Sequence, residues 1–200
     1  MPIDPGLPIV FIRHGETDWN KQGLIQGSID TDLNATGHAQ AKALADALSV
    51  HAAEWAGYEI IVSPQRRARQ TADYVLAALS RSDWASEARV RELGFGVWEG
   101  KPFWELKDSP VYPADPEGRF FWRPEGGESY EDGVSRVNDW RTTLTRPTLV
   151  ISHGAVGRCL MGAVAGLGPG DIVALPTPQG AYCRLQQGTI QWFDAMDVRA

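Results

Sequence analysis

The chain has 200 residues, of which 43% are hydrophobic and 22% are charged, and its formal net charge is −6 at pH 7. This length favours a single domain, and this composition is ordinary for a globular protein that buries a sizeable core. The negative charge argues against nucleic acid and anionic membranes as partners, because both require a broad basic surface. A small anionic ligand stays possible, since a few arginines in one pocket outweigh the overall sign.

The two cysteines and the N-terminal residues give information about the cellular compartment of the protein. Cys159 and Cys183 form no spacing typical of a metal or redox motif, so we expect two buried thiols in a reducing compartment. Residues 1–6 lack the basic start and long apolar run of a secretion signal, and no other apolar run approaches membrane-spanning length. The expected location is the cytoplasm.

The chain begins with a predicted strand at residues 9–12, a run of four apolar side chains. A polar, turn-rich loop is expected over residues 18–35. An alanine-rich helix is predicted over residues 37–48, with Thr36 as its N-cap. His38 and His51, near the ends of this helix, are expected to be surface residues and not ligands.

A second strand is predicted at residues 58–62, followed by a helix over 65–79 with Ser63 as N-cap and Pro64 at the first helical position. Three arginines lie in the first two turns of this helix, at positions 66, 67 and 69. Cations oppose the helix dipole at that end, so their presence indicates that an anion binds nearby. The alternative for any one of them is an ordinary surface arginine.

Residues 88–101 mix glycines with aromatic residues and are typical of an irregular loop wall. Glu92 lies there between apolar neighbours, where burial would raise the pKa of its carboxyl group and make it a usable general acid. The alternative is a solvated loop glutamate. Residues 102–128 contain five prolines and many aromatic residues, which suit either a lid over a site or a hydrophobic packing insert.

The last third contains a predicted helix from Ser129 to about residue 144 and a third strand at residues 148–152. His153 and Gly154 follow this strand directly, before a helix over 155–165. Two further segments, 181–185 and 190–193, are separated by a turn and predict a hairpin at an antiparallel edge.

Each of the three predicted strands ends in a charged or histidine-bearing turn and is followed by a helix. This pattern predicts a three-layer αβα sandwich with a mostly parallel sheet. In such sheets ligands bind beyond the carboxyl ends of the strands, where this chain places Arg13, His14, Ser63 and His153. Two histidines with matching context favour function over an accidental placement.

These residue types suit phosphoryl transfer. A neutral imidazole is a good nucleophile near pH 7, and the phosphate monoester that it attacks is a dianion. Arg13, one arginine of the 66–69 group and a protonated His153 supply positive charge. Glu92 gives a proton to the leaving alkoxide and later activates water. The scheme needs no metal and no cofactor.

Several motifs together resemble the histidine phosphatase superfamily, the phosphoglycerate mutase-like group. They are Arg13-His14-Gly15-Glu16-Thr17 with Trp19-Asn20 and Gln26-Gly27, Ser63-Pro64-Gln65-Arg66-Arg67-Ala68, Glu92 with Gly96-Val97-Trp98-Glu99-Gly100, Gly126-Gly127-Glu128-Ser129, and Ser152-His153-Gly154. Their order and spacing match the family over nearly the whole chain.

The resemblance implies a role for each matching residue. His14 is the implied phosphorylated nucleophile, Glu92 the implied proton donor, and Arg13, Arg67 and His153 the groups that hold the phosphoryl group. Further implied phosphate-binding residues are Asn20, Gln26, Gly27 and Gly154. Arg67, which precedes Ala68, matches the family's phosphate-binding arginine better than Arg66, but the sequence leaves the choice between these two neighbours open. The implied organisation is one domain over residues 1–200, with a lid-like insert at about 101–128.

The family contains phosphatases and mutases, and a phosphatase acting on a small phosphate monoester and releasing inorganic phosphate is favoured here. A mutase needs extra cations and a substantial lid to keep water from the phosphohistidine. Here Glu92 is followed by apolar and small residues, and the insert is short, aromatic and poor in cations. The alternatives are a cofactor-dependent phosphoglycerate mutase and a non-catalytic protein that binds a phosphate ligand or serves as a scaffold.

Overall fold

The computed structural model describes residues 6–195 and has a six-stranded sheet at its centre. The strands are β1 (Ile9–Arg13), β2 (Glu59–Val62), β3 (Ala85–Ser86), β4 (Thr148–Ser152), β5 (Ala181–Gln186) and β6 (Thr189–Asp194), in the spatial order β3-β2-β4-β1-β5-β6. β3, β2, β4 and β1 run parallel, whereas β5 pairs antiparallel with β1 and with β6. The mostly parallel sheet and its antiparallel edge hairpin are therefore confirmed.

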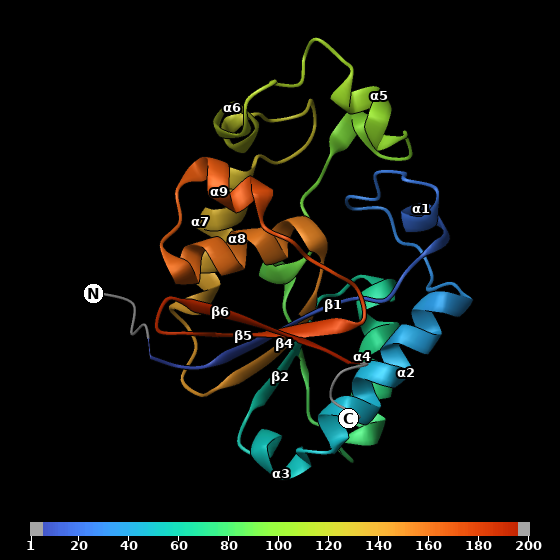
Figure 1. Ribbon diagram of the computed structural model, residues 1–200, viewed down its shortest axis with the longest axis vertical. Coiled ribbons are helices and arrows are strands. Elements are labelled where there is room, and N and C mark those ends of the chain that lie inside the picture. The colour runs from blue at the N-terminus through green and yellow to red at the C-terminus, as the bar shows by residue number, and fades with distance from the viewer. Residues whose placement is uncertain (1–5, 196–200) are drawn as a thin grey trace.

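Helices cover both faces of the sheet, as Figure 1 shows. One layer contains α2 (Ala35–Ser49), α3 (Ala52–Trp55) and α4 (Arg66–Ala78), and the other contains α7 (Tyr130–Arg141), α8 (Gly154–Ala165) and α9 (Pro169–Ala174). Successive side chains of a strand point to opposite faces. In β1, Val10 and Ile12 accordingly pack in the core beneath α2 and α4, while Ile9 and Phe11 pack in the core beneath α8.

Shorter elements surround the carboxyl edge of the parallel strands. They are α1 (Asp18–Lys21), η1 (Ala88–Val90), η2 (Gly96–Trp98), α5 (Phe103–Lys107) and α6 (Pro116–Phe121). The segment predicted as irregular thus holds two short helices, and its α6 packs on α9. None of the helices between residues 6 and 195 has both the length and the apolar character needed to cross a bilayer.

Two predicted helix caps are wrong. α2 begins one residue before Thr36, and its N-cap is Asn34, whose side chain accepts from the N–H of Gly37 at 2.9 Å and donates to Glu16. α4 begins at Arg66 with Gln65 as N-cap, so Ser63 and Pro64 both lie before the helix. The hydroxyl of Ser63 contacts Nε2 of His153 at 2.6 Å and the N–H of Gln65 at 3.4 Å. The helix predicted to start at Ser129 is α7, with Ser129 as its N-cap, and it ends at Arg141, before the predicted end near residue 144.

Candidate active site

His14 lies directly after β1, almost fully buried at 2% exposure. Its Nδ1 is 2.7 Å from the carbonyl oxygen of Gly15, so Nδ1 carries the proton in this contact and Nε2 keeps its lone pair. The backbone around it is held by the N–H of Gly15, which donates to the hydroxyl of Thr71 at 3.1 Å. The imidazole is thereby oriented with a free basic nitrogen.

Gly15 is a glycine because two backbones meet there. A Cβ on Gly15 would overlap the carbonyl oxygen of Gly37, and a Cβ on Gly37 would overlap the backbone of Glu16. The chain after β1 therefore lies directly against the first turn of α2, which sets the position of His14 relative to the helix.

Arg67, in the first turn of α4, is completely buried. Its Nε donates to Nδ1 of His153 at 3.2 Å, and its two Nη atoms donate to the carbonyl oxygens of Ile29 and Gly27 at 2.8 and 3.0 Å. These bonds use three of its five N–H groups. By contrast, the side chain of Arg66 points outward, is 57% exposed and pairs with Asp32. The structure therefore places Arg67, and not Arg66, in the site.

His153 follows β4 and is fully buried. Because Nδ1 accepts from Arg67, the proton lies on Nε2, which donates to the hydroxyl of Ser63 at 2.6 Å. The pKa values of His14 and His153 lie well below 6.5, first because of burial and then because of the Arg67 charge. These contacts and the lowered pKa give a neutral His153 in this structure. The expected protonated His153 concerns the site with a bound dianion, which would raise both pKa values, and it stays a prediction.

Glu92 is half-buried, and its carboxylate lies at the N-terminus of α8. It accepts from the N–H groups of Ala155 at 3.2 Å and Val156 at 3.0 Å. The N–H of Glu92 in turn donates to the side-chain oxygen of Gln65 at 2.7 Å. The N–H of Leu93 also donates to Oε1 of Glu92 at 3.1 Å. Because the helix dipole and three backbone donors hold it there, the Glu92 carboxylate has a defined position over the pocket.

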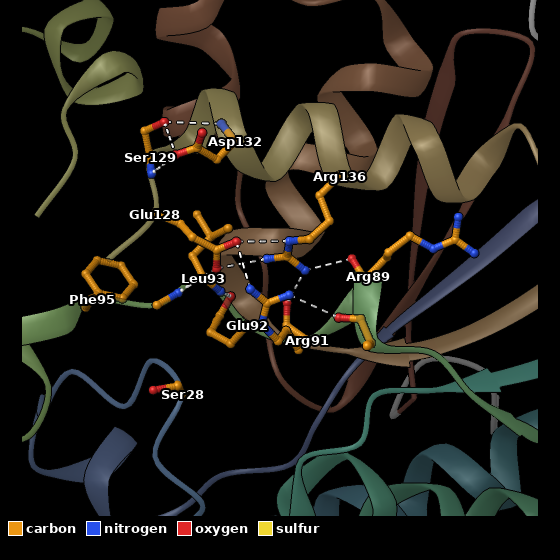
Figure 2. A network of polar contacts seen from close by, with 12 residues as sticks. Ser28, Arg89, Arg91, Glu92, Leu93, Phe95, Glu128, Ser129, Asp132 and Arg136 are labelled. Atoms are coloured by element: carbon orange, nitrogen blue, oxygen red, sulfur yellow. Dashed lines mark hydrogen bonds and ion pairs between the residues drawn. The ribbon is translucent and has the colours of Figure 1, made fainter. Parts of the chain in front are cut away.

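The loop that carries Glu92 is fastened to α7 by Glu128 and Arg136 (Figure 2). Arg136 donates to the carbonyl oxygens of Arg89 and Arg91 at 2.7 and 2.9 Å, and its Nε lies 3.2 Å from Oε1 of Glu128. Glu128 also pairs with Arg91 at 3.0 Å and accepts from the N–H of Gly94 at 3.0 Å. The backbone is thus held on both sides of Glu92.

The loop before α2 brings Gly27 to the site. Gly27 has φ of +53°, and a Cβ there would overlap the carboxylate of Glu99. That carboxylate accepts from the N–H and hydroxyl of Ser28 at 2.8 and 2.7 Å. Nearby, Oδ1 of Asn20 accepts from Gln179 at 3.0 Å, and Oε1 of Gln26 accepts from a threonine hydroxyl. Both amide side chains line the pocket, where their NH₂ groups can donate.

These residues surround a pocket of about 410 Å³. Among the residues predicted from sequence, the lining contains Arg13, His14, Asn20, Gln26, Gly27, Arg67, Glu92 and Gly154. His153 lies behind this lining, with its ring centroid 5.1 Å from that of His14. The outer wall is aromatic and includes Phe95, Phe103, Tyr112 and Trp122.

Several residues of this site were not predicted from the sequence. The carbonyl oxygen of Thr177 accepts from Nη1 of Arg13 at 2.6 Å, and Gln179 donates to the carbonyl oxygen of His14 at 3.3 Å. Tyr130 and Arg158 also line the pocket. The signal for Arg158 was its position on α8, one turn after Gly154, which places both residues on the same helix face. Thr177 and Gln179 carry no such signal, since they lie in a loop.

Known proteins resemble this chain over most of its length. It is 33% identical over 177 residues to glucosyl-3-phosphoglycerate phosphatase of Mycolicibacterium vanbaalenii, covering 80% of this chain and 74% of the relative. It is also 33% identical over 173 residues to an Escherichia coli protein named probable phosphoglycerate mutase GpmB, covering 80% and 76%.

Solved structures also resemble this chain over most of its length. The structure of a mycobacterial glucosyl-3-phosphoglycerate phosphatase with VO3 superposes with a TM-score of 0.77 at 26% identity, covering 94% of this chain and 97% of the other. A structure of the phosphatase with inorganic phosphate superposes with a TM-score of 0.74 at 26% identity, covering 94% and 95%. Residues 9–193 match the model of the histidine phosphatase superfamily, branch 1, and the chain therefore belongs to the histidine phosphatase superfamily.

Proposed function

We propose that this protein is a phosphatase that hydrolyses a small phosphate monoester through a phosphohistidine at His14. Nε2 of His14 attacks phosphorus, the bond from phosphorus to the ester oxygen breaks, and Glu92 gives its proton to the leaving alkoxide. The Glu92 carboxylate then takes a proton from water, whose oxygen forms a bond to phosphorus while the bond from phosphorus to Nε2 of His14 breaks, which releases inorganic phosphate and returns the free imidazole. Its relatives named as phosphatases support hydrolysis.

One observation carries this proposal. The contact between Nδ1 of His14 and the carbonyl oxygen of Gly15 leaves Nε2 unprotonated in a pocket whose lining includes the guanidinium groups of Arg13 and Arg67. Nε of Arg13 is buried and has no hydrogen-bond partner among residues 6–195, and Arg67 keeps two N–H groups. These donors suit the equatorial oxygens of a phosphoryl group, whose negative charge they stabilise.

The test is turnover of p-nitrophenyl phosphate by the purified protein. Wild type should hydrolyse it and His14→Asn should not, while His51→Asn, a change at an exposed histidine outside the site, should retain full turnover. Rapid acid-free quenching should trap a phosphohistidine on the wild type and on His51→Asn, but not on His14→Asn. Absence of wild-type turnover, with phosphate binding intact, would instead support the non-catalytic alternative.

No metal takes part in the proposed steps. Turnover measured after incubation with EDTA and removal of the chelator should equal that of untreated protein. Loss of activity that a divalent cation restores would contradict the mechanism. The expected cytoplasmic location and the single domain with a lid-like insert stay predictions.

A phosphoglycerate mutase is the second candidate, because one relative bears that name. A mutase must hold a bisphosphorylated intermediate, which requires cations around the second phosphoryl group. Of the cations at residues 101–128, Arg119 lines the pocket, whereas Arg123 pairs with Asp132 and Lys101 lies over the Trp98 ring. The insert thus supplies one pocket cation, Arg119, beside Arg158 of α8, and this small number of cations favours hydrolysis. Isomerisation of 3-phosphoglycerate only after priming with the bisphosphate would identify a mutase.

A further inference from the structure

A buried glutamine behind the pocket lining joins two loops of the site, and the steps described above give it no role. Gln65 is the N-cap of α4 and is 7% exposed. Its Oε1 accepts from the N–H of Glu92 at 2.7 Å, and its Nε2 donates to the carbonyl oxygen of Gly27 at 2.9 Å. The amide therefore bridges the loop of the proton donor and the loop that brings Gly27 to the pocket.

The two partners of this amide fix its chemical type. The N–H of Glu92 can only donate and the carbonyl oxygen of Gly27 can only accept, so the amide oxygen faces the first and the NH₂ group the second. A carboxylate at position 65 would present an oxygen to the carbonyl of Gly27. An apolar side chain would leave both partners without their bond. The position therefore requires a side chain that accepts at one atom and donates at another.

The proton donor is held at both ends by different helices. Its carboxylate accepts from the N–H groups of Ala155 and Val156 at the start of α8, in the helix layer on one face of the sheet. Its backbone N–H is bound by Gln65 at the start of α4, in the helix layer on the other face (Figure 1). Loss of the second attachment should shift the carboxyl group of Glu92 relative to the leaving-group oxygen.

The other end of the amide shares its acceptor with Arg67. The carbonyl oxygen of Gly27 accepts from Nη2 of Arg67 at 3.0 Å as well as from Gln65. Arg67 has two further bonds, to another carbonyl oxygen at 2.8 Å and to His153 at 3.2 Å, so its position does not depend on Gln65. Removal of the amide should therefore affect Glu92 more than the binding of phosphate.

The two loops have other connections that keep them together. The carboxylate of Glu99 accepts from the N–H of Ser28 at 2.8 Å and from the N–H of Phe95 at 2.9 Å. The N–H of Gly100 donates to the carbonyl oxygen of Ile25 at 2.8 Å. The chain should therefore keep its fold without the amide at position 65, with the change confined to the proton donor.

We propose that Gln65 is a positioning residue for the proton donor, because its amide fixes the backbone of Glu92 against Gly27. This inference rests on the proposed function, which assigns the proton transfer to Glu92. Gln65 is not among the residues that line the pocket and transfers no proton itself. A carboxyl group displaced by about 1 Å transfers its proton less well, and the loss increases with the basicity of the leaving group.

The test compares two aryl phosphates of similar shape in single-turnover measurements of the first step. The leaving group of phenyl phosphate is more basic than that of p-nitrophenyl phosphate, so it depends more on proton donation. Gln65→Met removes both hydrogen bonds and keeps an unbranched side chain. The ratio of the phenyl rate to the p-nitrophenyl rate should fall at least about fivefold, while the inhibition constant of inorganic phosphate should change by less than about threefold.

Gln70→Met is the matched control. Gln70 lies on the same helix, and its amide likewise bridges a backbone N–H and an acceptor. It accepts from the N–H of Leu33 at 2.8 Å and donates to the carboxylate of Asp32 at 2.9 Å. Neither partner lines the pocket. Gln70→Met should therefore keep the wild-type ratio within about twofold, which separates the loss of a buried amide from the loss of this one.

Gln65→Asn is a second variant, because its amide is one methylene shorter and cannot reach both partners unless a loop moves. It should lower the ratio by the same minimum, and it decides the result if Gln65→Met does not fold, as judged by circular dichroism. The proposal is overturned if the ratio falls less than about fivefold in the deciding variant, or if Gln70→Met lowers it as much.

Failure of the proposed function has a different signature, since wild type would then turn over neither aryl phosphate. Hydrogen exchange at the Glu92 amide, followed by NMR, still tests the attachment in that case. Exchange should be slow in wild type and in Gln70→Met and clearly faster in both Gln65 variants. Equal exchange rates in all four proteins would show that Gln65 does not hold the backbone of Glu92.

Discussion

The imidazole rings of His14 and His153 lie with their centroids 5.1 Å apart and their planes inclined by 58°. Nε of Arg67 donates to Nδ1 of His153, so the positive charge of Arg67 disfavours protonation of both rings. Burial and these charges keep both rings neutral in the free protein, with pKa values well below 6.5. For a nucleophilic imidazole this is the reactive form.

The first prediction concerns the pH dependence of activity. Because the pKa of His14 is depressed, kcat/KM for p-nitrophenyl phosphate should persist as the pH falls through 6.5, and its acid limb should lie below that value. The substrate's own ionisation is titrated by phosphorus NMR and divided out. An acid limb centred at or above pH 6.5 would show that the environment does not suppress protonation of His14.

The second prediction concerns stability. In the unfolded chain both imidazoles regain a pKa of about 6.5, so below that pH the unfolded state binds more protons than the folded state. The stabilisation is fully present above pH 6.5 and is lost as the pH falls toward the depressed folded values. Urea unfolding should therefore show a loss of about 1 kcal/mol per histidine between pH 7.5 and 5.5. The double variant His14→Asn/His153→Asn should show a smaller loss.

The third prediction tests Glu92 as proton donor. Ala155 donates to Oε2 of Glu92 and Val156 to Oε1, so Glu92→Gln keeps one of these two acceptor oxygens, replaces the other by an NH₂ group and removes the transferable proton. Hydrolysis of an alkyl phosphate should fall by about 10²–10⁴-fold, because an alkoxide leaves poorly without a proton. Hydrolysis of p-nitrophenyl phosphate, whose leaving group is stable as an anion, should fall much less in its first step. Single-turnover measurements separate that step, and equal losses for both substrates would argue against this role.

The fourth prediction addresses Glu128 as a positioning residue. Glu128→Gln removes the charge that pairs with Arg91 and Arg136, which loosens the backbone on both sides of Glu92. We expect kcat for an alkyl phosphate to fall at least about tenfold with less change for p-nitrophenyl phosphate, as with Glu92→Gln but weaker. A uniform loss for both substrates, matched by a lower melting temperature, would indicate a structural role only.

The fifth prediction concerns the backbone contact behind His14. Gly15→Ala places a Cβ against the carbonyl oxygen of Gly37, and neither backbone can move without disturbing β1 or α2. The free energy of unfolding should fall by about 1–3 kcal/mol, measured with urea. Gly57→Ala is the matched control, because no heavy atom lies within 4 Å of its Cβ position. The control should change stability by less than about 0.5 kcal/mol.

Much of the fold follows from local sequence. Three short apolar runs, each followed by a helix, predicted β1, β2, β4 and the layers around them. Because the carboxyl ends of parallel strands meet at one edge, the same pattern predicted that Arg13, His14 and His153 would come together. β3 was not predicted, since it has only two residues and both are exposed.

Residue order alone left the arginine of α4 unresolved, and the helix geometry decided it. Consecutive residues of a helix point about 100° apart, so Arg67 enters the site while Arg66 reaches Asp32 at the surface. Tertiary structure also decided the role of Ser63. Its local sequence suits a helix cap, but its hydroxyl contacts Nε2 of His153. Local propensity is weaker than a buried tertiary hydrogen bond.

Sequence by itself determined which chemistry this chain carries: an imidazole at a strand end, arginines at a helix start and an acid in a glycine-rich loop. Only the tertiary structure decided which nitrogen of His153 carries the proton and that Arg158 donates to Tyr130. It also decided that Glu128 and Arg136 hold the backbone on both sides of Glu92. The physical reason is that protonation and orientation depend on burial and on partners distant in the chain. Those partners become neighbours only when the helices pack against the sheet.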